Sequence, residues 1–164
     1  MKLDSRPVRK SDFPAICSFA VSPMELYYFH PKASYPLTPA ALGKTIEARA
    51  SATVVLWQEA VAGFADLFDC ERGVRCRIGN VIVAPAHRGK GVATFLVERM
   101  IEIAISVHDA RVVELGCFNT NIAGLRLYPK LGFQPFEIES RTGPAGEPLA
   151  LIQMRLALRN PDKV

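Results

Sequence analysis

The chain has 164 residues, 49% of them hydrophobic, and a formal net charge of +4 at pH 7. This length suits one compact domain with its own core and is too short for two ordinary domains, so we expect a single domain over residues 1–164. No apolar run approaches the roughly 18 residues of a membrane-spanning helix, and the N-terminus lacks the apolar core of a signal peptide. The sequence therefore predicts a soluble, cytoplasmic protein with no membrane partner.

The positive charge does not by itself indicate a nucleic-acid partner. Lysine and arginine are scattered along the chain, and no nucleic-acid-binding motif is present, so a nucleic-acid binder is a distant alternative. A modest positive field suits a polyanionic cofactor equally well. The four cysteines form no Cys-x-x-Cys pair and the three histidines lie far apart in the sequence. This pattern predicts reduced, structural thiols and no metal site.

The first fifty residues predict one strand and then helices. Residues 3–8 form a mixed run typical of an edge strand, and a helix is expected from residue 13 to about residue 20. Four prolines within residues 22–39 exclude one long helix there, so we expect a short helical turn and a semi-rigid loop. The aromatic residues of this loop either build a pocket or cover the core. A second helix should run from residue 39 to about residue 50.

The middle of the chain changes to strands. Residues 53–58 and 61–68 predict a hairpin, and residues 75–83 supply the third strand of a meander. An amphipathic helix begins at Val92, with apolar residues at three- and four-residue steps. Residues 111–117 are predicted as a strand parallel to residues 75–83, because a helix of some fifteen residues joins the two through a right-handed crossover.

The C-terminal part predicts one more helix and two strands. The helix covers residues 122–131, and Gly132 ends it in the left-handed conformation. Residues 133–140 and 148–157 are predicted as strands around a loop at residues 141–147. The whole order is α+β with a mixed sheet.

A basic glycine turn separates the strand that ends at residue 83 from the following helix. Its sequence is Arg88-Gly89-Lys90-Gly91-Val92-Ala93. Two glycines let a ligand approach the backbone, two side chains are cationic, and the helix presents its positive end, so the turn is a seat for a phosphate group. The Walker pattern Gly-x-x-x-x-Gly-Lys-Ser/Thr is absent. The dinucleotide pattern Gly-x-Gly-x-x-Gly is absent too, because positions 86 and 94 are Ala86 and Thr94.

Two motifs resemble those of the GNAT superfamily of acetyl-CoA-dependent N-acetyltransferases. The turn resembles its pyrophosphate-binding pattern Arg/Gln-x-x-Gly-x-Gly/Ala, and residues 121–133 resemble its Asn-x-x-Ala/Gly-x-x-Leu-Tyr-x-Lys-x-Gly-Phe signature. The order of elements matches the GNAT fold along nearly the whole chain. The resemblance implies a mostly antiparallel mixed sheet of about seven strands, with about four helices on both faces and a central parallel strand pair that forms the CoA cleft.

The resemblance also implies acetyl-CoA as cosubstrate and direct transfer of its acetyl group to an amine. Tyr128 would be the general acid that protonates the departing thiolate, since a phenol with an ordinary pKa near 10 carries its proton at neutral pH. The CoA pyrophosphate would bind the turn, and the pantetheine arm would bind the preceding strand and Asn121. The expected cofactor residues are Val81, Ile82, Val83, Arg88, Gly89, Lys90, Gly91, Val92, Ala93 and Asn121.

The general base is not evident from the sequence. Family members often use a glutamate on the strand before the turn, whereas residues 75–83 contain no carboxylate. Glu25, Asp66 and Glu114 are candidates, and each is also explained as a solvated or structural carboxylate. Asn80 can orient a water and cannot itself act as a base. We expect Glu25, Tyr28 and Asn80 near the acceptor.

The sequence thus predicts an N-acetyltransferase that acts on a primary amine of a small molecule and uses no metal. The alternatives are a protein acetyltransferase acting on an N-terminal or lysine amine and a non-catalytic acyl-CoA-binding module. The loops at residues 22–39 and 141–147 would shape the acceptor pocket. The acceptor, the base, the acyl-chain preference and the presence of a homodimer stay open.

Overall fold

The computed structural model of the protein describes residues 2–158. Its strands are β1 (Leu3–Pro7), β2 (Ala50–Trp57), β3 (Ala60–Glu71), β4 (Arg75–Val83), β5 (Val112–Phe118), β6 (Gln134–Thr142) and β7 (Pro148–Ala157). Its α-helices are α1 (Phe13–Cys17), α2 (Pro23–Phe29), α3 (Pro39–Glu47), α4 (Val92–His108) and α5 (Ile122–Lys130). Two short 3-10 helices, η1 (Lys10–Asp12) and η2 (Pro85–His87), precede α1 and the glycine turn.

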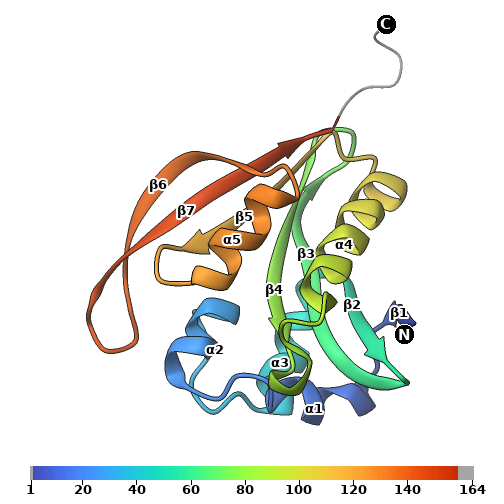
Figure 1. The fold of residues 1–164 in the computed structure, drawn as a ribbon, viewed down its shortest axis with the longest axis vertical. Coiled ribbons are helices and arrows are strands. Elements are labelled where there is room, and N and C mark those ends of the chain that lie inside the picture. Colours follow the sequence, from blue (N-terminus) through green and yellow to red (C-terminus); the bar gives the residue numbers. More distant parts are fainter. Residues whose placement is uncertain (1, 159–164) are drawn as a thin grey trace, which may run out of the picture.

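One seven-stranded sheet in the order β1-β2-β3-β4-β5-β7-β6 runs through the molecule (Figure 1). Among the described strands, every neighbouring pair is antiparallel except β4 and β5, which α4 connects in parallel. The predicted α+β fold, with about seven strands and one parallel pair, is confirmed. No helix within residues 2–158 is both long enough and apolar enough to cross a membrane.

The described residues contain five α-helices where about four were expected. The difference lies in the proline-rich segment, where a short helical turn was predicted and a seven-residue helix, α2, forms. Ser22 caps this helix by accepting a hydrogen bond from the Glu25 backbone N–H, and Pro23 occupies the first helical position, where its missing N–H costs nothing. Proline therefore starts this helix and does not prevent it.

Two clusters of buried side chains hold helices against the two faces of the sheet. One cluster is centred on α4, whose Leu96 and Met100 are fully buried against β3, β4 and β5. The other joins α1, α2 and α3 to the opposite face through residues such as Phe64 and Leu42. The sheet is thus fixed from both sides, and truncating one such side chain to alanine typically costs about 2–5 kcal/mol.

The parallel pair β4–β5 is joined at only one end. Residues 75–77 pair with residues 112–114, and beyond this point β4 stays with β3 while β5 continues along β7. The register between β3 and β4 shifts near Asp66, where Asn80 adopts a left-handed backbone with φ of 52°. This bulge adds a residue to β4 and bends it, as bulges do. We call residues 75–77 and 112–114 the closed end, and residues 79–83 and 116–118 the open end.

Candidate active site

A cavity of about 480 Å³ lies at the open end. It is lined by the second half of β4, the glycine turn, the first turn of α4, and residues of α2 and α5. A smaller cavity of about 40 Å³ lies between β4 and β5. The larger volume is typical of cofactor and small-molecule sites, and the smaller is enough for a water molecule or two.

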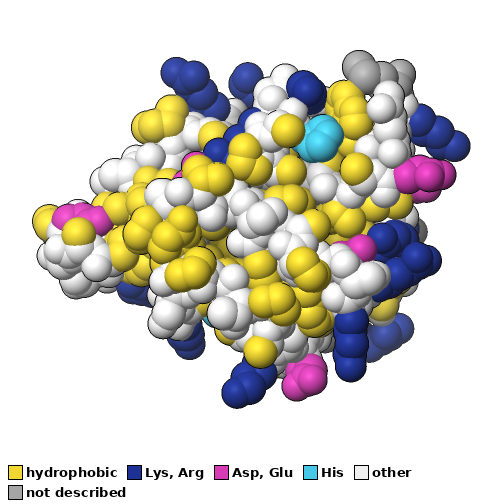
Figure 2. All heavy atoms as spheres, turned by 90° about the horizontal axis from the view of Figure 1, so that it is seen from below, with side chains coloured by type: hydrophobic (Ala, Val, Ile, Leu, Met, Phe, Trp, Pro, Cys, Tyr) yellow, Lys and Arg dark blue, Asp and Glu magenta, His cyan; other side chains and the backbone are white. Residues whose placement is uncertain are grey.

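Figure 2 shows the side of the molecule on which β4 ends. Hydrophobic side chains gather across the middle of this face, and most lysine and arginine side chains lie towards its edge. The larger cavity is correspondingly rich in apolar lining residues, among them Val81, Val83, Val92 and Leu127. Its polar groups are few, as in most ligand sites.

The two sequence motifs meet at this cavity. All of the expected cofactor residues except Lys90 line it, together with Glu25, Tyr28 and Tyr128, and Asn80 lines the smaller cavity. They meet because β4 and β5 run in parallel, so the helices that follow these strands, α4 and α5, begin at the same edge of the sheet. The ammonium group of Lys90 instead lies 5.6 Å from the centroid of the Trp57 ring.

The glycine turn exposes backbone N–H groups at the start of α4. Gly89 and Gly91 have φ values of 70° and 82°, in the left-handed region that only glycine adopts without strain. Apart from the adjacent residues of the chain, no atom of the described residues lies within 4 Å of the position that a Cβ would take at either glycine. The first intrahelical bond runs from the Phe95 N–H to the Gly91 carbonyl, 3.0 Å away. The N–H groups of the preceding turn are therefore left for an anion.

The positive charge of Arg88 is directed away from this anion seat. Its guanidinium donates to both carboxylate oxygens of Glu25, at 2.9 and 3.0 Å, and to the carbonyls of Phe19 and Val83, at 3.1 and 3.2 Å. The sequence predicts that Arg88 and Lys90 attract a phosphate by their positive charges. In the structure, Arg88 pairs with Glu25 of α2, and the ammonium group of Lys90 lies over the Trp57 ring. The helix N-terminus and the backbone supply the positive field.

The same ion pair limits Glu25 as a base. The guanidinium of Arg88 holds the pKa of Glu25 below its usual range, and the Val21 N–H, which donates to the carboxylate, acts in the same direction. A carboxylate with a lowered pKa accepts a proton less readily. Glu25 therefore tethers the turn to α2.

Tyr128 projects from α5 and lines both cavities. It is 6% exposed, and burial raises its pKa well above the ordinary value, an effect to which the neighbouring Cys117 adds. Its ring fits because residue 124 is glycine. A Cβ there would lie 3.0 Å from the Tyr128 ring and 2.8 Å from the Cys117 Sγ. The phenol is thus held in one place and keeps its proton at neutral pH.

Asn121 is the N-cap of α5 and also faces both cavities. Its Oδ1 accepts a hydrogen bond from the Gly124 N–H at 3.1 Å. The side-chain amide still has its Nδ2 donor for a ligand. One residue therefore stabilises the helix that carries Tyr128 and presents a donor to the cavity.

Helix α2 forms a wall beside the cavity and is fixed by two tyrosines. The Tyr28 hydroxyl donates to Thr120 Oγ1 at 2.8 Å, and the Tyr27 hydroxyl donates to the Thr142 carbonyl at 2.8 Å. Both rings pack on Phe118, with centroids 6.0 and 4.8 Å away respectively. These contacts join α2 to the start of α5 and to the β6–β7 hairpin.

The remaining carboxylates suggested as bases do not reach either cavity. Asp66 is fully buried behind Asn80, whose Nδ2 donates to Asp66 Oδ2 at 2.6 Å. Burial raises the pKa of Asp66 to about 6, against the Asn80 hydrogen bond and the charge of Arg49. Glu114 is buried at the closed end among Arg77, Arg155 and Arg75. Among the residues that line the smaller cavity, none is a carboxylate.

The sequence analysis did not select His87 or assign a role to Gly124. His87 lines the larger cavity, and its buried Nδ1 has no hydrogen-bond partner within the described residues. Its position directly before Arg88 is a signal that could have identified it. Gly124 lies within the quoted signature, but its contact with Cys117 joins two elements and is not visible in a linear motif.

Comparison with known proteins gives one family and one fold. The family model described as "Acetyltransferase (GNAT) family" matches residues 16–133. A ribosomal-protein-alanine N-acetyltransferase from Brucella melitensis has a similar structure, with a TM-score of 0.77 and 22% identity, covering 94% of this chain and 99% of its own.

Two structures with bound cofactor are also similar. An acetyltransferase from Salmonella typhimurium, described as putative and solved with acetyl-CoA, has a TM-score of 0.73 and 22% identity over 100% of this chain and 98% of its own. A spermidine N-acetyltransferase from Vibrio cholerae, in complex with CoA and spermine, has a TM-score of 0.79 and 18% identity, covering 94% of this chain and 95% of its own. At these identities the likeness shows the shared fold.

Proposed function

The chain belongs to the acetyltransferase (GNAT) family and is an acetyl-CoA-dependent N-acetyltransferase, and we propose that its acceptor is the primary amine of a small molecule. One observation carries this proposal. The parallel strands β4 and β5 separate at a cavity of about 480 Å³ whose lining contains residues of both the glycine turn and the segment from Asn121 to Tyr128. A thioester placed there would lie between a phosphate seat and a phenol.

The cofactor would bind along the free edge of β4. Beyond Arg77, no strand of the described part of the chain pairs with this edge, because β5 continues along β7. The backbone N–H and C=O groups at residues 81–83 that do not face β3 need hydrogen-bond partners, apart from the Val83 carbonyl, which accepts from Arg88. The amides of a pantetheine arm are partners of that kind. The pyrophosphate would bind the N–H groups at the start of α4, and Asn121 Nδ2 would donate to the arm.

The reaction then needs only groups that face the cavities. The amine nitrogen attacks the thioester carbonyl, a backbone N–H at the open end stabilises the oxyanion, and the C–S bond breaks. The thiolate takes the phenol proton of Tyr128. The acceptor first loses its ammonium proton to bulk solvent and attacks as the neutral amine. It then releases a second proton to water in the smaller cavity, where Asn80 would orient that water, and the water restores the proton of Tyr128. The proton count balances without a carboxylate base.

The shape of the acceptor side favours a small molecule. The tyrosine contacts of α2 with Thr120 and Thr142 hold this helix beside the cavity, and a wall in that position would favour a small acceptor over a protein surface. Glu25 is the only carboxylate among the residues that line the larger cavity, and Arg88 neutralises it. A polyamine would bring several positive charges to a site without a free negative group. We therefore expect amines with one charge and an apolar or aromatic body to be better acceptors.

A panel of acceptors tests this proposal. Purified protein would be given acetyl-CoA and either aromatic monoamines, spermine or peptides with free N-terminal amines, and thiol release would be measured. We expect kcat/KM for the best monoamine to exceed that for spermine and for the peptides by at least about tenfold, which corresponds to about 1.4 kcal/mol. Peptides as the best acceptors would support the protein acetyltransferase alternative. Acetyl-CoA binding without turnover of any amine would support a binding module.

A further inference from the structure

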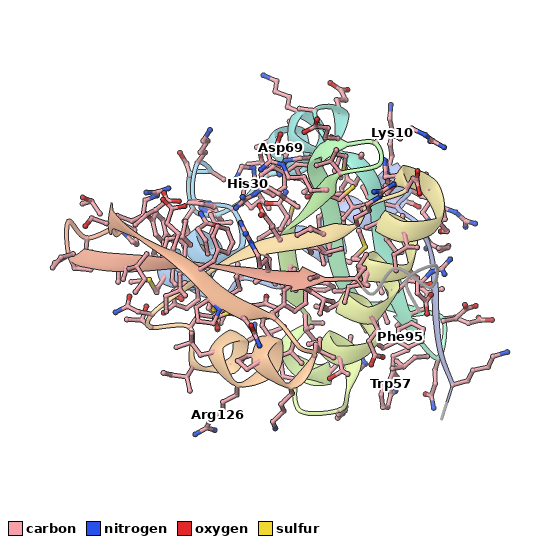
Figure 3. The ribbon with its side chains drawn as sticks, turned by 90° about the horizontal axis from the view of Figure 1, so that it is seen from above. Lys10, His30, Trp57, Asp69, Phe95 and Arg126 are labelled. Carbon is pink, nitrogen blue, oxygen red and sulfur yellow. The ribbon has the colours of Figure 1, made fainter. Side chains whose placement is uncertain are left out.

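Three side chains with metal-binding atoms converge at the closed end, away from both cavities. They are Cys70 of β3, Cys76 of β4 and His108, the last residue of α4. The two sulfurs and one imidazole nitrogen all lie within 4.8 Å of one another. None of the three residues lines either cavity. Figure 3 views the molecule from this end and labels Asp69, the neighbour of Cys70 in the chain.

The fold itself makes this cluster. In the register of β3 with β4, Phe68 pairs with Arg77 and Glu71 with Arg75. The strand is irregular between these two pairs, so that residues 69 and 70 of β3 lie against Cys76 alone. The turn between these strands is attached to the end of α4, since the Gly73 N–H donates to the His108 carbonyl at 3.3 Å and Arg72 donates to the Val107 carbonyl at 3.3 Å. The three residues are therefore held together by backbone contacts that do not depend on a ligand.

We propose that Cys70, Cys76 and His108 bind one soft divalent cation of the zinc class. Two thiolates and an imidazole are donors that zinc prefers, whereas magnesium and calcium take oxygen ligands. With Zn–S bonds of about 2.3 Å and Zn–N bonds of about 2.0–2.1 Å, tetrahedral ligand atoms lie about 3.5–3.8 Å apart. The cluster limit of 4.8 Å is about 1 Å wider. Small side-chain rotations would close that difference.

The surroundings of the cluster agree with a three-ligand site. Cys76 is buried, whereas Cys70 and His108 are half-buried, so a fourth position faces solvent and suits a water ligand. The Ser51 hydroxyl lies 3.0 Å from His108 Nε2 and restrains the imidazole. Outer hydrogen bonds of this kind orient metal-binding histidines. The bound ion would fasten the β3–β4 turn to α4 and brace the closed end.

Cobalt titration of the full chain tests the site. Reduced protein freed of metal with a chelator would be titrated with Co²⁺, and absorption would be recorded for thiolate-to-cobalt charge transfer and for the visible bands of tetrahedral cobalt. We expect one Co²⁺ per chain, displaced by Zn²⁺. Cys70→Ser and His108→Ala should each weaken binding by at least about tenfold. Cys17→Ser, which changes a half-buried thiol of α1, is the matched control and should bind as the wild type does.

Both test substitutions are at half-buried positions, and an unchanged thermal shift with acetyl-CoA would verify that each variant is folded. The proposal is overturned if the charge-transfer absorption is absent, or if it persists unchanged in Cys70→Ser and His108→Ala. A Cys70–Cys76 disulfide in air-oxidised protein, with no cobalt uptake after reduction, would also overturn it and assign the pair to thiol redox chemistry.

Discussion

The two ends of the β4–β5 pair differ in what satisfies their polar groups. At the closed end the strands are hydrogen-bonded to each other, and the buried carboxylate of Glu114 receives hydrogen bonds from Arg77 at 3.0 Å and Arg155 at 3.1 Å. At the open end, no described strand pairs with the edge of β4, and the first turn of α4 has N–H groups without an intrahelical partner. The closed end therefore stabilises the fold, and the open end has free backbone groups that can bind a ligand.

The two ends also differ in how they treat charge. The closed end pairs ionised side chains with one another within the protein, as in the Glu114 cluster. The open end has a single ion pair, Glu25 with Arg88, among its cavity-lining residues, and its functional groups are otherwise neutral. Substitutions at the open end should therefore change catalysis or ligand affinity, and substitutions at the closed end should change stability.

Removing the Tyr128 hydroxyl should give the largest effect. Tyr128→Phe keeps the ring, so stability and acetyl-CoA affinity should change little, while kcat falls by roughly 10²-fold, the low end of the usual range for a general acid. The low end is expected because CoA thiolate is itself a tolerable leaving group, and the defect should shrink above the pKa of the CoA thiol. Steady-state kinetics with a chemistry-limited acceptor measures this. Tyr35→Phe, at an exposed tyrosine, is the control. Full turnover of Tyr128→Phe at pH 7 would make Tyr128 structural.

Glu114→Gln should give an effect of comparable size, on stability. The substitution keeps the shape of the side chain but removes the buried counter-charge of Arg77 and Arg155. Breaking a buried ion pair from one side costs about 3 kcal/mol or more in the free energy of unfolding. Chemical denaturation measures it. Glu102→Gln, which breaks the exposed pair with Arg99, should cost less than about 1 kcal/mol. Equal effects would remove the distinction between the closed end and the surface.

The pH dependence of stability should depend on Asp66, which lies behind the open end. Its pKa is raised from the ordinary 3.8 to about 6, so the folded chain binds this proton more tightly than the unfolded chain. The resulting stability is present below about pH 4 and is lost as pH rises through about 6. Asp66→Asn, which is neutral throughout, should therefore stabilise the protein at pH 8 by about 1–3 kcal/mol and have little effect near pH 4. Denaturation at both pH values measures this, and a pH-independent difference would contradict it.

The smallest effect is expected in the turn, where two glycines permit a matched test. Gly91 and Gly146 share a φ of 82°, and within residues 2–158 neither has an atom beyond its own chain neighbours within 4 Å of a Cβ position. Alanine should therefore impose similar backbone strain at both. Gly91→Ala should weaken CoA binding by about tenfold, or about 1.4 kcal/mol, whereas Gly146→Ala, in the β6–β7 turn, should leave affinity unchanged. Calorimetric titration measures both. Equal affinities would show that the ligand does not approach Gly91.

The sequence predicted those features that short segments encode. The bounds of β4 and β7 agree with the predicted strands, and α4 begins at the predicted residue, because each has a regular apolar pattern and a clear turn beside it. Helix α1 ends at Cys17, three residues before the predicted end. Helix α3 also ends early, at Glu47, because Ala50 already pairs with Leu67 in the sheet. Strand pairing thus overrode local helix propensity.

Features that depend on distant pairings could not be predicted in this way. The separation of β4 from β5 depends on the partner that each strand keeps on its other side. Arg88 and Glu25 are 63 positions apart in the sequence. The glycine-turn motif contains only the arginine, so the motif gives no sign that this charge is paired. The grouping of Cys70, Cys76 and His108 likewise needs the β3–β4 register and the end of α4. The spacing of residues in the sequence shows neither the β3–β4 register nor the position of the end of α4.

Hydrogen–deuterium exchange with and without acetyl-CoA tests most directly that the open end is the binding site and the closed end its support. Ligand should slow amide exchange in residues 79–83, 89–94 and 121–128, because their N–H groups line the cavity or lie on elements that the ligand would hold. Exchange in residues 75–77 and 112–114 should stay unchanged, since these strands are already paired. Protection at the closed end with none in residues 89–94 would contradict the account.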